Sequence, residues 1–92
     1  MPDVEIFTRR FCGYCRRAKA LLQARDIDFT EVDVSGDPAA EALMIERAGG
    51  AYTVPQIFIN GRHAGGSDEL AELDAAGRLD ALLGAAEPAG EK

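Results

Sequence analysis

Apolar and polar residues alternate along two short segments near the start of the chain, with a helical pattern between them. Residues 4–8 and 29–34 are rich in β-branched and aromatic residues and alternate in polarity, which predicts two β-strands. Between them, Cys15, Ala18 and Leu22 recur at the spacing of one helical face. Strand, helix and strand within about 30 residues form a βαβ unit, whose crossover is expected to be right-handed.

The second half of the chain predicts another helix followed by a β-hairpin. Residues 37–47 open with Asp and Pro, the residue types that cap and begin a helix. Residues 56–59 form an apolar strand, and Asn60-Gly61 is a strong signal for a two-residue hairpin turn. A short fourth strand is therefore expected around residues 62–64.

The last elements are predicted to be helical. Ser67 has the residue type that caps a helix, which we expect to end near Gly77 before a last apolar turn at residues 79–83. Residues 85–92 offer no core residue larger than alanine, so we expect a flexible C-terminal tail there. The chain length of 92 residues suits a single domain, which we place over residues 1–84.

These elements follow one another in the order β-α-β-α-β-β-α. A parallel pair of strands followed by a hairpin gives a small four-stranded mixed sheet, and helices are expected to flank it on both faces. The predicted class is therefore α/β, a three-layer sandwich, and the element order is that of the thioredoxin fold.

Composition limits the partners and the compartment of this domain. A net charge of −6 argues against a general nucleic-acid-binding protein. No segment approaches the run of roughly 18 apolar residues that a membrane span needs, and the acidic first residues are unlike the basic start of a signal peptide. We expect a cytoplasmic protein, and in a reducing compartment a close cysteine pair is catalytic or metal-binding rather than structural.

The two cysteines are Cys12 and Cys15, and the charge around them is opposite in sign to that of the whole chain. Residues 6–25 contain no Asp or Glu but six basic residues, namely Arg9, Arg10, Arg16, Arg17, Lys19 and Arg25. This segment carries +6, so the remaining residues carry −12 to give the total of −6. Positive potential and the start of a helix both favour a thiolate at Cys12.

The two cysteines are not expected to be equivalent. Cys15 lies on the apolar helical face and should be shielded, whereas Cys12 precedes the first turn and should be exposed. A Cys12 thiolate would attack a disulfide, and Cys15 would resolve the resulting mixed disulfide. A structural zinc site needs four ligands, but these cysteines and His63 supply only three conventional candidates. A c-type haem motif would need a histidine where Arg16 stands.

Two segments of the second half could bind a ligand beside this pair. Pro55 begins or precedes a strand, and the sequence alone leaves its peptide bond open between trans and cis. Residues 65–68 either end a strand before a capped helix or form an anion site, where glycine allows close approach and the helix start holds a carboxylate. His63 is expected to be a surface residue of the hairpin.

Three blocks of residues, taken together, resemble the glutaredoxin family. They are residues 8–15, 53–59 and 65–70, and the resemblance covers nearly the whole domain. It implies a glutathione-dependent thiol–disulfide oxidoreductase that reduces protein disulfides and protein–glutathione mixed disulfides. It also implies that Cys12 is the nucleophile and Cys15 the resolving residue, with glutathione as the reducing co-substrate of a monomer.

The resemblance further implies a set of glutathione-binding residues. The basic residue at position 9 would bind a glutathione carboxylate, and Tyr14 would border the sulfur and the bound tripeptide. Val54 would hold the cysteinyl backbone beside a cis Pro55, and residues 66–68 would hold the γ-glutamyl end. The implied set is Arg9, Tyr14, Thr53, Val54, Pro55, Gly66, Ser67 and Asp68.

The chain departs from the usual family pattern in three places. Gly13 stands where proline is commonest, and relatives with a small residue there sometimes bind a [2Fe–2S] cluster between two subunits through the first cysteine and glutathione. Arg9 replaces the more usual lysine and keeps the charge. Residues 49–52 are one residue longer than usual, so no glutathione contact is assigned to the preceding helix.

Two other functions stay open beside the glutathione-dependent reductase. The first is a [2Fe–2S] carrier, in which Cys12 would be the cluster ligand of a site where no metal is otherwise expected. The second is a redoxin reduced by thioredoxin reductase. The anion-binding residues Arg9, Ser67 and Asp68 weigh against it, because that partner presents no glutathione carboxylates.

Overall fold

The computed structural model describes residues 3–84. In chain order the elements are β1 (Val4–Thr8), α1 (Gly13–Ala24), β2 (Thr30–Asp33), α2 (Pro38–Arg47), β3 (Gln56–Ile59), β4 (Arg62–Gly65), α3 (Ser67–Ala75) and α4 (Leu79–Gly84). The predicted order is confirmed, and the last apolar turn forms a short helix of its own. The predicted tail, residues 85–92, lies outside the described residues, as do residues 1 and 2. None of the helices in the described part of the chain is long and apolar enough to cross a membrane.

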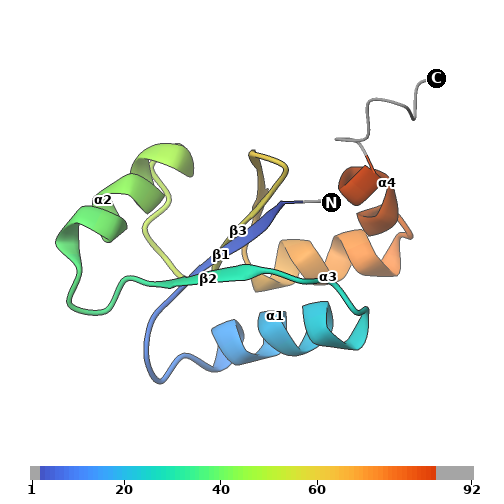
Figure 1. Cartoon of the computed structure of the whole chain (residues 1–92), viewed down its shortest axis with the longest axis horizontal. Coiled ribbons are helices and arrows are strands. Elements are labelled where there is room, and N and C mark those ends of the chain that lie inside the picture. Colours follow the sequence, from blue (N-terminus) through green and yellow to red (C-terminus); the bar gives the residue numbers. More distant parts are fainter. Residues whose placement is uncertain (1–2, 85–92) are drawn as a thin grey trace.

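The four strands form one mixed sheet in the order β2-β1-β3-β4. β1 runs parallel to β2 and antiparallel to β3, and β3 pairs antiparallel with β4. The turn between β3 and β4 uses Asn60 and Gly61 with φ angles of 52° and 81°, as the hairpin signal predicts. Figure 1 shows α2 on one face of the sheet and α1 and α3 on the other, so the predicted three layers are confirmed.

Alternate strand positions build a separate core on each face of the sheet. Between the sheet and α1, α3 and α4, the buried residues are Val4, Ile6, Ala18, Leu22, Ile57, Ile59, Leu70 and Leu79. On the α2 side they are Phe7, Val34, Met44, Ala48 and Phe58. Phe7 and Phe58 meet there edge to face, with their ring centroids 5.6 Å apart. Because β1 and β3 are packed on both faces, they form a rigid support for the loops at their ends.

Polar groups cap the first turns of α2 and α3. Asp37 caps α2 as predicted, because its Oδ1 accepts a hydrogen bond from a first-turn amide at 3.1 Å, and Pro38 is the first helical residue. At α3 the predicted Ser67 cap is wrong, since Ser67 is already helical and Gly66 precedes it. The Gly66 amide instead donates to Glu69 Oε1 at 2.7 Å, so a carboxylate from the first turn satisfies this end of the helix.

Two glycines allow the end of β4 and the start of α3 to pack this closely. Gly65 has a φ of +107°, and a Cβ there would lie 2.8 Å from the Cβ and Cγ of Glu69. A Cβ on Gly66 would lie 3.3 Å from the carbonyl oxygen of Pro55. Gly65 is therefore required by its backbone angle and by its neighbour, and Gly66 brings the start of α3 against the residues before β3.

Candidate active site

Cys12 occupies the N-cap position of α1, and its sulfur caps the helix. The Sγ atom accepts a hydrogen bond from the Cys15 amide at 3.1 Å. Backbone N–H groups at a helix start favour a negative charge, and the first turn of α1 contains no acidic residue. The sequence predicted an exposed Cys12, but the structure has it half-buried. The reason is the loop before β3, whose Val54 carbonyl oxygen lies 3.9 Å from Cys12 Sγ.

Cys15 lies one helical turn further along α1 and faces the core. Its side chain is 2 % exposed, as its place on the apolar face predicts. Burial raises the pKa of the Cys15 thiol to about 12, and a hydrogen bond with Cys12 contributes to the rise. Cys15 therefore keeps its proton at neutral pH. The two sulfurs differ in environment although only two residues separate them.

The loop that follows α2 brings Thr53, Val54 and Pro55 opposite Cys12. The Val54–Pro55 peptide bond is cis, the state that the family resemblance implied and the residues alone left open. Pro55 is buried and directly precedes the first residue of β3, so its missing N–H is not needed within that strand. The loop thus reaches the cysteine pair from the end of a central strand.

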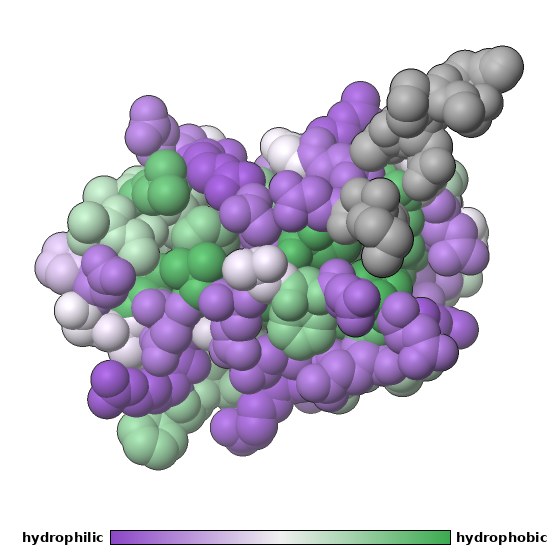
Figure 2. Space-filling model, in the orientation of Figure 1, coloured by the Kyte–Doolittle hydropathy of each residue, from purple (hydrophilic) through white to green (hydrophobic). Residues whose placement is uncertain are grey.

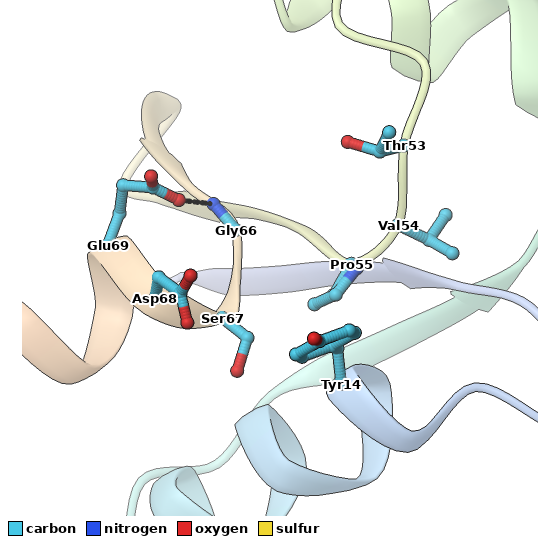
Figure 3. Close-up of a pocket in the computed structure, with 8 residues that line it drawn as sticks. All are labelled: Tyr14, Thr53, Val54, Pro55, Gly66, Ser67, Asp68 and Glu69. Carbon is cyan, nitrogen blue, oxygen red and sulfur yellow. Dashed lines mark hydrogen bonds between the residues drawn. The ribbon is translucent and has the colours of Figure 1, made fainter.

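A pocket of about 310 Å³ lies between this loop, the start of α1 and the start of α3. In Figure 3 the Tyr14 ring lies beneath Pro55, with Ser67 and Asp68 beside it. Seven of the eight residues expected to bind glutathione line this pocket, and they come from three separate parts of the chain. They are Tyr14, Thr53, Val54, Pro55, Gly66, Ser67 and Asp68.

Arg9 is the expected binding residue that the structure does not bring to the pocket. It follows β1 and forms an ion pair with Glu41, which lies in the first turn of α2. Arg9 and Glu41 are each about one-third exposed, so this pair is open to solvent and to exchange with another carboxylate. The predicted contact with a glutathione carboxylate stays a prediction.

The basic cluster around the cysteines is largely neutralised by acidic residues from the rest of the fold. Besides Arg9, the ion-paired residues and their partners are Arg10 with Asp33 at 3.9 Å, Lys19 with Glu31 at 3.0 Å and Arg25 with Asp74 at 2.8 Å. The Arg17 guanidinium lies 5.4 Å from the centroid of the Tyr14 ring. Figure 2 shows hydrophilic side chains along the edge that α1 forms at the bottom of the view. Four of the six basic residues of segment 6–25 are therefore ion-paired with acidic residues.

Glu69 lines the pocket but is not among the binding residues predicted from the sequence. Its carboxylate accepts the hydrogen bond from the Gly66 amide, shown as a dashed line in Figure 3, and it lines the pocket beside Asp68. The available signal was a glutamate three residues after a position that can precede a helix. With the cap predicted at Ser67 instead of Gly66, the third residue after the cap is Leu70, so Glu69 does not fit the capping pattern.

Gly13 is the first residue of α1, where proline is well accepted. A Cβ on Gly13 would lie 3.8 Å from Nη2 of Arg16, an ordinary contact, so no close approach requires glycine here. Among residues 3–84, no three His, Cys, Asp or Glu side chains gather closely enough to hold a metal ion. The [2Fe–2S] alternative would take Cys12 from two subunits and stays a prediction.

Comparison with known proteins identifies close relatives. The family model described as glutaredoxin matches residues 4–64. Glutaredoxin 3 of Escherichia coli K12 is 51% identical over 83 residues, which cover 90% of this chain and 99% of that protein. The solution structure of a glutaredoxin from Brucella melitensis has 51% identity and a TM-score of 0.77, with 88% of this chain and 87% of that chain covered. A crystal structure of a buckwheat glutaredoxin–glutathione complex has 30% identity and a TM-score of 0.78, with 87% and 74% covered.

Proposed function

The chain belongs to the glutaredoxin family, and we propose that it uses glutathione to reduce protein disulfides and protein–glutathione mixed disulfides. As a member of that family it is a thiol–disulfide oxidoreductase, and the proposal adds the reductant, the substrates and the roles of single residues. The observation that carries it is the position of Cys12. Its sulfur caps α1 and lies beside a pocket whose size and polar groups suit a small peptide.

For a glutathionylated protein the proposed reaction needs Cys12 alone. Its thiolate attacks the glutathione sulfur of the mixed disulfide, so a Cys12–glutathione disulfide forms and the protein leaves as a thiolate that takes up a proton. A second glutathione, as its thiolate, then attacks the glutathione sulfur bound to Cys12. Glutathione disulfide forms, and Cys12 returns to the thiolate.

For a protein disulfide the reaction also needs Cys15. Cys12 attacks one sulfur and forms a mixed disulfide with the protein, whose other sulfur leaves and takes up a proton. Cys15 then attacks the Cys12 sulfur and loses its proton, while the protein leaves as a second thiol. Because the pKa of Cys15 is about 12, this thiol does not compete with Cys12 for the substrate beforehand. Two glutathione molecules reduce the Cys12–Cys15 disulfide and become glutathione disulfide.

We place glutathione in the pocket beside Tyr14. The backbone of Thr53 and Val54 offers hydrogen-bonding groups to its cysteinyl residue, and the start of α3 at residues 66–68 offers N–H groups to its γ-glutamyl carboxylate. Arg9 would take the glycine carboxylate in exchange for its present partner. The buckwheat relative in complex with glutathione supports a tripeptide as the ligand.

We also place the protein in the cytoplasm, as a monomer whose partners are glutathione and proteins that carry disulfides or glutathione. A reducing glutathione pool there would keep Cys12 and Cys15 available as thiols. The net charge of −6 disfavours nucleic acid as a partner.

The test of this function compares two reductants on the same substrate. Reduction of a glutathionylated peptide is measured with glutathione and glutathione reductase, and in parallel with thioredoxin reductase. We expect turnover with glutathione for the wild type and for Cys15→Ser, and none for Cys12→Ser. Reduction of a protein disulfide should be lost or strongly reduced in both variants.

Turnover that depends on thioredoxin reductase alone would contradict the proposed reductant. A Cys12→Ser protein that still reduces the glutathionylated peptide would contradict the proposed nucleophile. Anaerobic purification with glutathione tests the remaining alternative, because a brown dimer with visible absorbance would favour the [2Fe–2S] carrier.

A further inference from the structure

His63 lies outside the pocket but is linked to it by hydrogen bonds. It is an exposed residue of β4, as predicted, and its Nε2 lies 2.5 Å from Oε1 of Gln56. Gln56, the first residue of β3, is 4 % exposed. The Gln56 Nε2 atom donates to the Thr53 carbonyl oxygen at 2.9 Å and to the Thr53 hydroxyl at 3.3 Å. A hydrogen-bonded chain therefore runs from His63 through Gln56 to Thr53.

The Thr53 carbonyl group sets the direction of every hydrogen bond in this chain. A carbonyl oxygen only accepts, so the amide nitrogen of Gln56 faces Thr53 and its amide oxygen faces His63. That amide oxygen also only accepts, so the His63 Nε2 atom carries the proton that it donates. Both polar ends of the nearly buried Gln56 side chain are then satisfied.

Packing holds the imidazole in the orientation that this hydrogen bond needs. The His63 ring lies against the Phe58 ring, with the centroids 5.1 Å apart and the planes tilted by 31°. Phe58 is fully buried, and the Arg47 guanidinium lies 4.3 Å from its centroid. His63 is thus supported by the core of the α2 side.

A second hollow, of about 450 Å³, adjoins the proposed glutathione pocket at this point. His63 and Gln56 line it, and it shares three lining residues with the pocket, namely Thr53, Gly66 and Glu69. The hydrogen-bonded chain therefore reaches the wall of the pocket from its outer side. A side chain exchanged at position 63 changes this hollow without entering the pocket itself.

The inner end of the chain is the loop that we place against glutathione. Thr53 and Val54 line the pocket, and the Val54 carbonyl oxygen is the atom 3.9 Å from Cys12 Sγ. Thr53 belongs to no helix or strand, so its backbone is held here by a side chain, Gln56. We propose that His63 is a positioning residue, which through Gln56 holds Thr53 and Val54 in the orientation that binds the glutathionyl part of the substrate. This inference rests on the proposed function.

The test replaces His63 by a residue that cannot donate and by one that can. His63→Leu leaves the Gln56 amide oxygen without its donor, whereas a glutamine at this position can donate from its side-chain amide. We expect KM for a glutathionylated peptide to rise about five- to tenfold in His63→Leu, the fold-change that one lost hydrogen bond of this kind produces, with kcat within about twofold. His63→Gln should restore KM to within about twofold of the wild type, and Arg62→Leu, an exposed exchange on the same strand, should leave it unchanged.

A wild-type KM in His63→Leu, or a His63→Gln protein as impaired as His63→Leu, would overturn the proposal. Gln56→Leu provides a second approach, because it removes the middle of the chain. Its effect on KM should be at least as large as that of His63→Leu, and the double variant should be no worse than Gln56→Leu alone. Effects of the two exchanges that multiply would show that His63 does not act through Gln56.

A measurement without substrate separates this inference from the proposed function. The side-chain amide protons of Gln56 should exchange slowly in the wild type and in His63→Gln, and faster in His63→Leu, as followed by NMR. Loss of protection in His63→Leu together with no turnover by glutathione in the wild type would support the positioning of the loop and refute the reductant. Unchanged exchange in His63→Leu would refute the positioning, whatever the reductant.

Discussion

The starts of α1 and α3 border the same pocket but are capped by groups of different chemistry. At α1 the cap is Cys12 Sγ, which accepts from the Cys15 amide at 3.1 Å, and the first turn holds no acidic residue. At α3 the Gly66 amide is held by Glu69 at 2.7 Å, and the first turn contains both Asp68 and Glu69. One helix start therefore holds the Cys12 sulfur, and the other is already occupied by the Glu69 carboxylate of the protein itself.

The difference shows that a helix N-terminus binds whichever acceptor lies against it, the N-cap sulfur at α1 and a carboxylate of the helix's own first turn at α3. At α1 the group at the helix start is the proposed nucleophile, Cys12, whose sulfur accepts a backbone N–H hydrogen bond. At α3 an incoming carboxylate must share the N–H groups with Glu69, which weakens the site while keeping it ordered. We expect α1 to control reactivity and α3 to adjust affinity, and the predictions below test this division.

The largest expected effect separates the two sulfurs of α1. In Cys15→Ser only the capping sulfur remains, and in Cys12→Ser only the buried one. Burial is the largest cause of the raised pKa of Cys15 and remains when Cys12 is replaced, so only a very small fraction of this thiol is ionised at pH 7. Iodoacetamide should therefore alkylate Cys12→Ser more than about 100-fold more slowly than Cys15→Ser.

The pH dependence of the alkylation rate of Cys12→Ser shows whether the pKa of Cys15 is raised or lowered. A raised pKa keeps the Cys15 proton on as pH increases, so alkylation of Cys12→Ser should keep rising well above pH 9 while the protein stays folded. A rate that levels off near pH 9 would mean that Cys15 is not desolvated. Cys12 and Cys15 would then not differ in environment as the structure indicates.

The next largest effect is expected from a substitution that disturbs the start of α3 but does not touch the start of α1. In Gly65→Ala the new Cβ would lie 2.8 Å from two carbons of Glu69 at a φ of +107°, which should cost about 2–4 kcal/mol of the free energy of unfolding. Gly36→Ala is the matched control, because its φ is +68° but nothing lies within 4 Å of the added Cβ. It should cost only about 1–2 kcal/mol. Urea unfolding measures both losses.

Under conditions where Gly65→Ala stays folded, the two helix starts should respond differently. KM for a glutathionylated peptide should rise, because the residues of α3 that line the pocket move away from Pro55. The alkylation rate of Cys12 should stay near the wild-type value, because α1 is capped by its own residues. A parallel loss of Cys12 reactivity would show that the two helix starts are not independent.

Most of the fold follows from local patterns in the sequence. The strands, the Asn60-Gly61 turn and the Asp37 cap depend on neighbouring residues, so the pattern of polarity and a few residue types are enough to predict them. The position of the α3 cap was wrong by one residue. Both Ser67 and Gly66 are compatible with a helix start, and the choice between them depends on how closely Glu69 packs against Gly65.

The site was predicted less completely because its contacts join distant segments. The three segments that line the pocket were all predicted, because each contains residue types that indicate a site: the cysteine pair, the proline before a strand, and the glycines before a helix. The pairing of Arg9 with Glu41 and the bonding of His63 to Gln56 depend on where α2 and β4 lie against β1 and β3. A count of charges in one segment cannot show which acidic residues of the folded chain will neutralise them.

A smaller effect tests whether the carboxylate at α3 competes with the ligand. Glu69→Gln keeps an oxygen that accepts from the Gly66 amide but removes the negative charge beside the pocket. KM for a glutathionylated peptide should fall about two- to fivefold at low salt, the size expected for one charge near a helix end. Glu72→Gln, on the exposed side of the same helix, should change KM less. A gain that does not shrink at high salt would contradict an electrostatic origin.

The smallest effect concerns Arg9, the one expected glutathione-binding residue that is outside the pocket lining. If its ion pair with Glu41 competes with a glutathione carboxylate, Glu41→Gln frees the guanidinium and lowers KM by about twofold at low salt, since a solvent-exposed pair is worth little. Glu46→Gln, exposed on the same helix α2, carries the same change of net charge and controls for it. Arg9→Leu should then raise KM and abolish the gain from Glu41→Gln, because both exchanges act on the same guanidinium. If Arg9→Leu leaves KM unchanged, the basic residue at position 9 serves only to tie the end of β1 to α2.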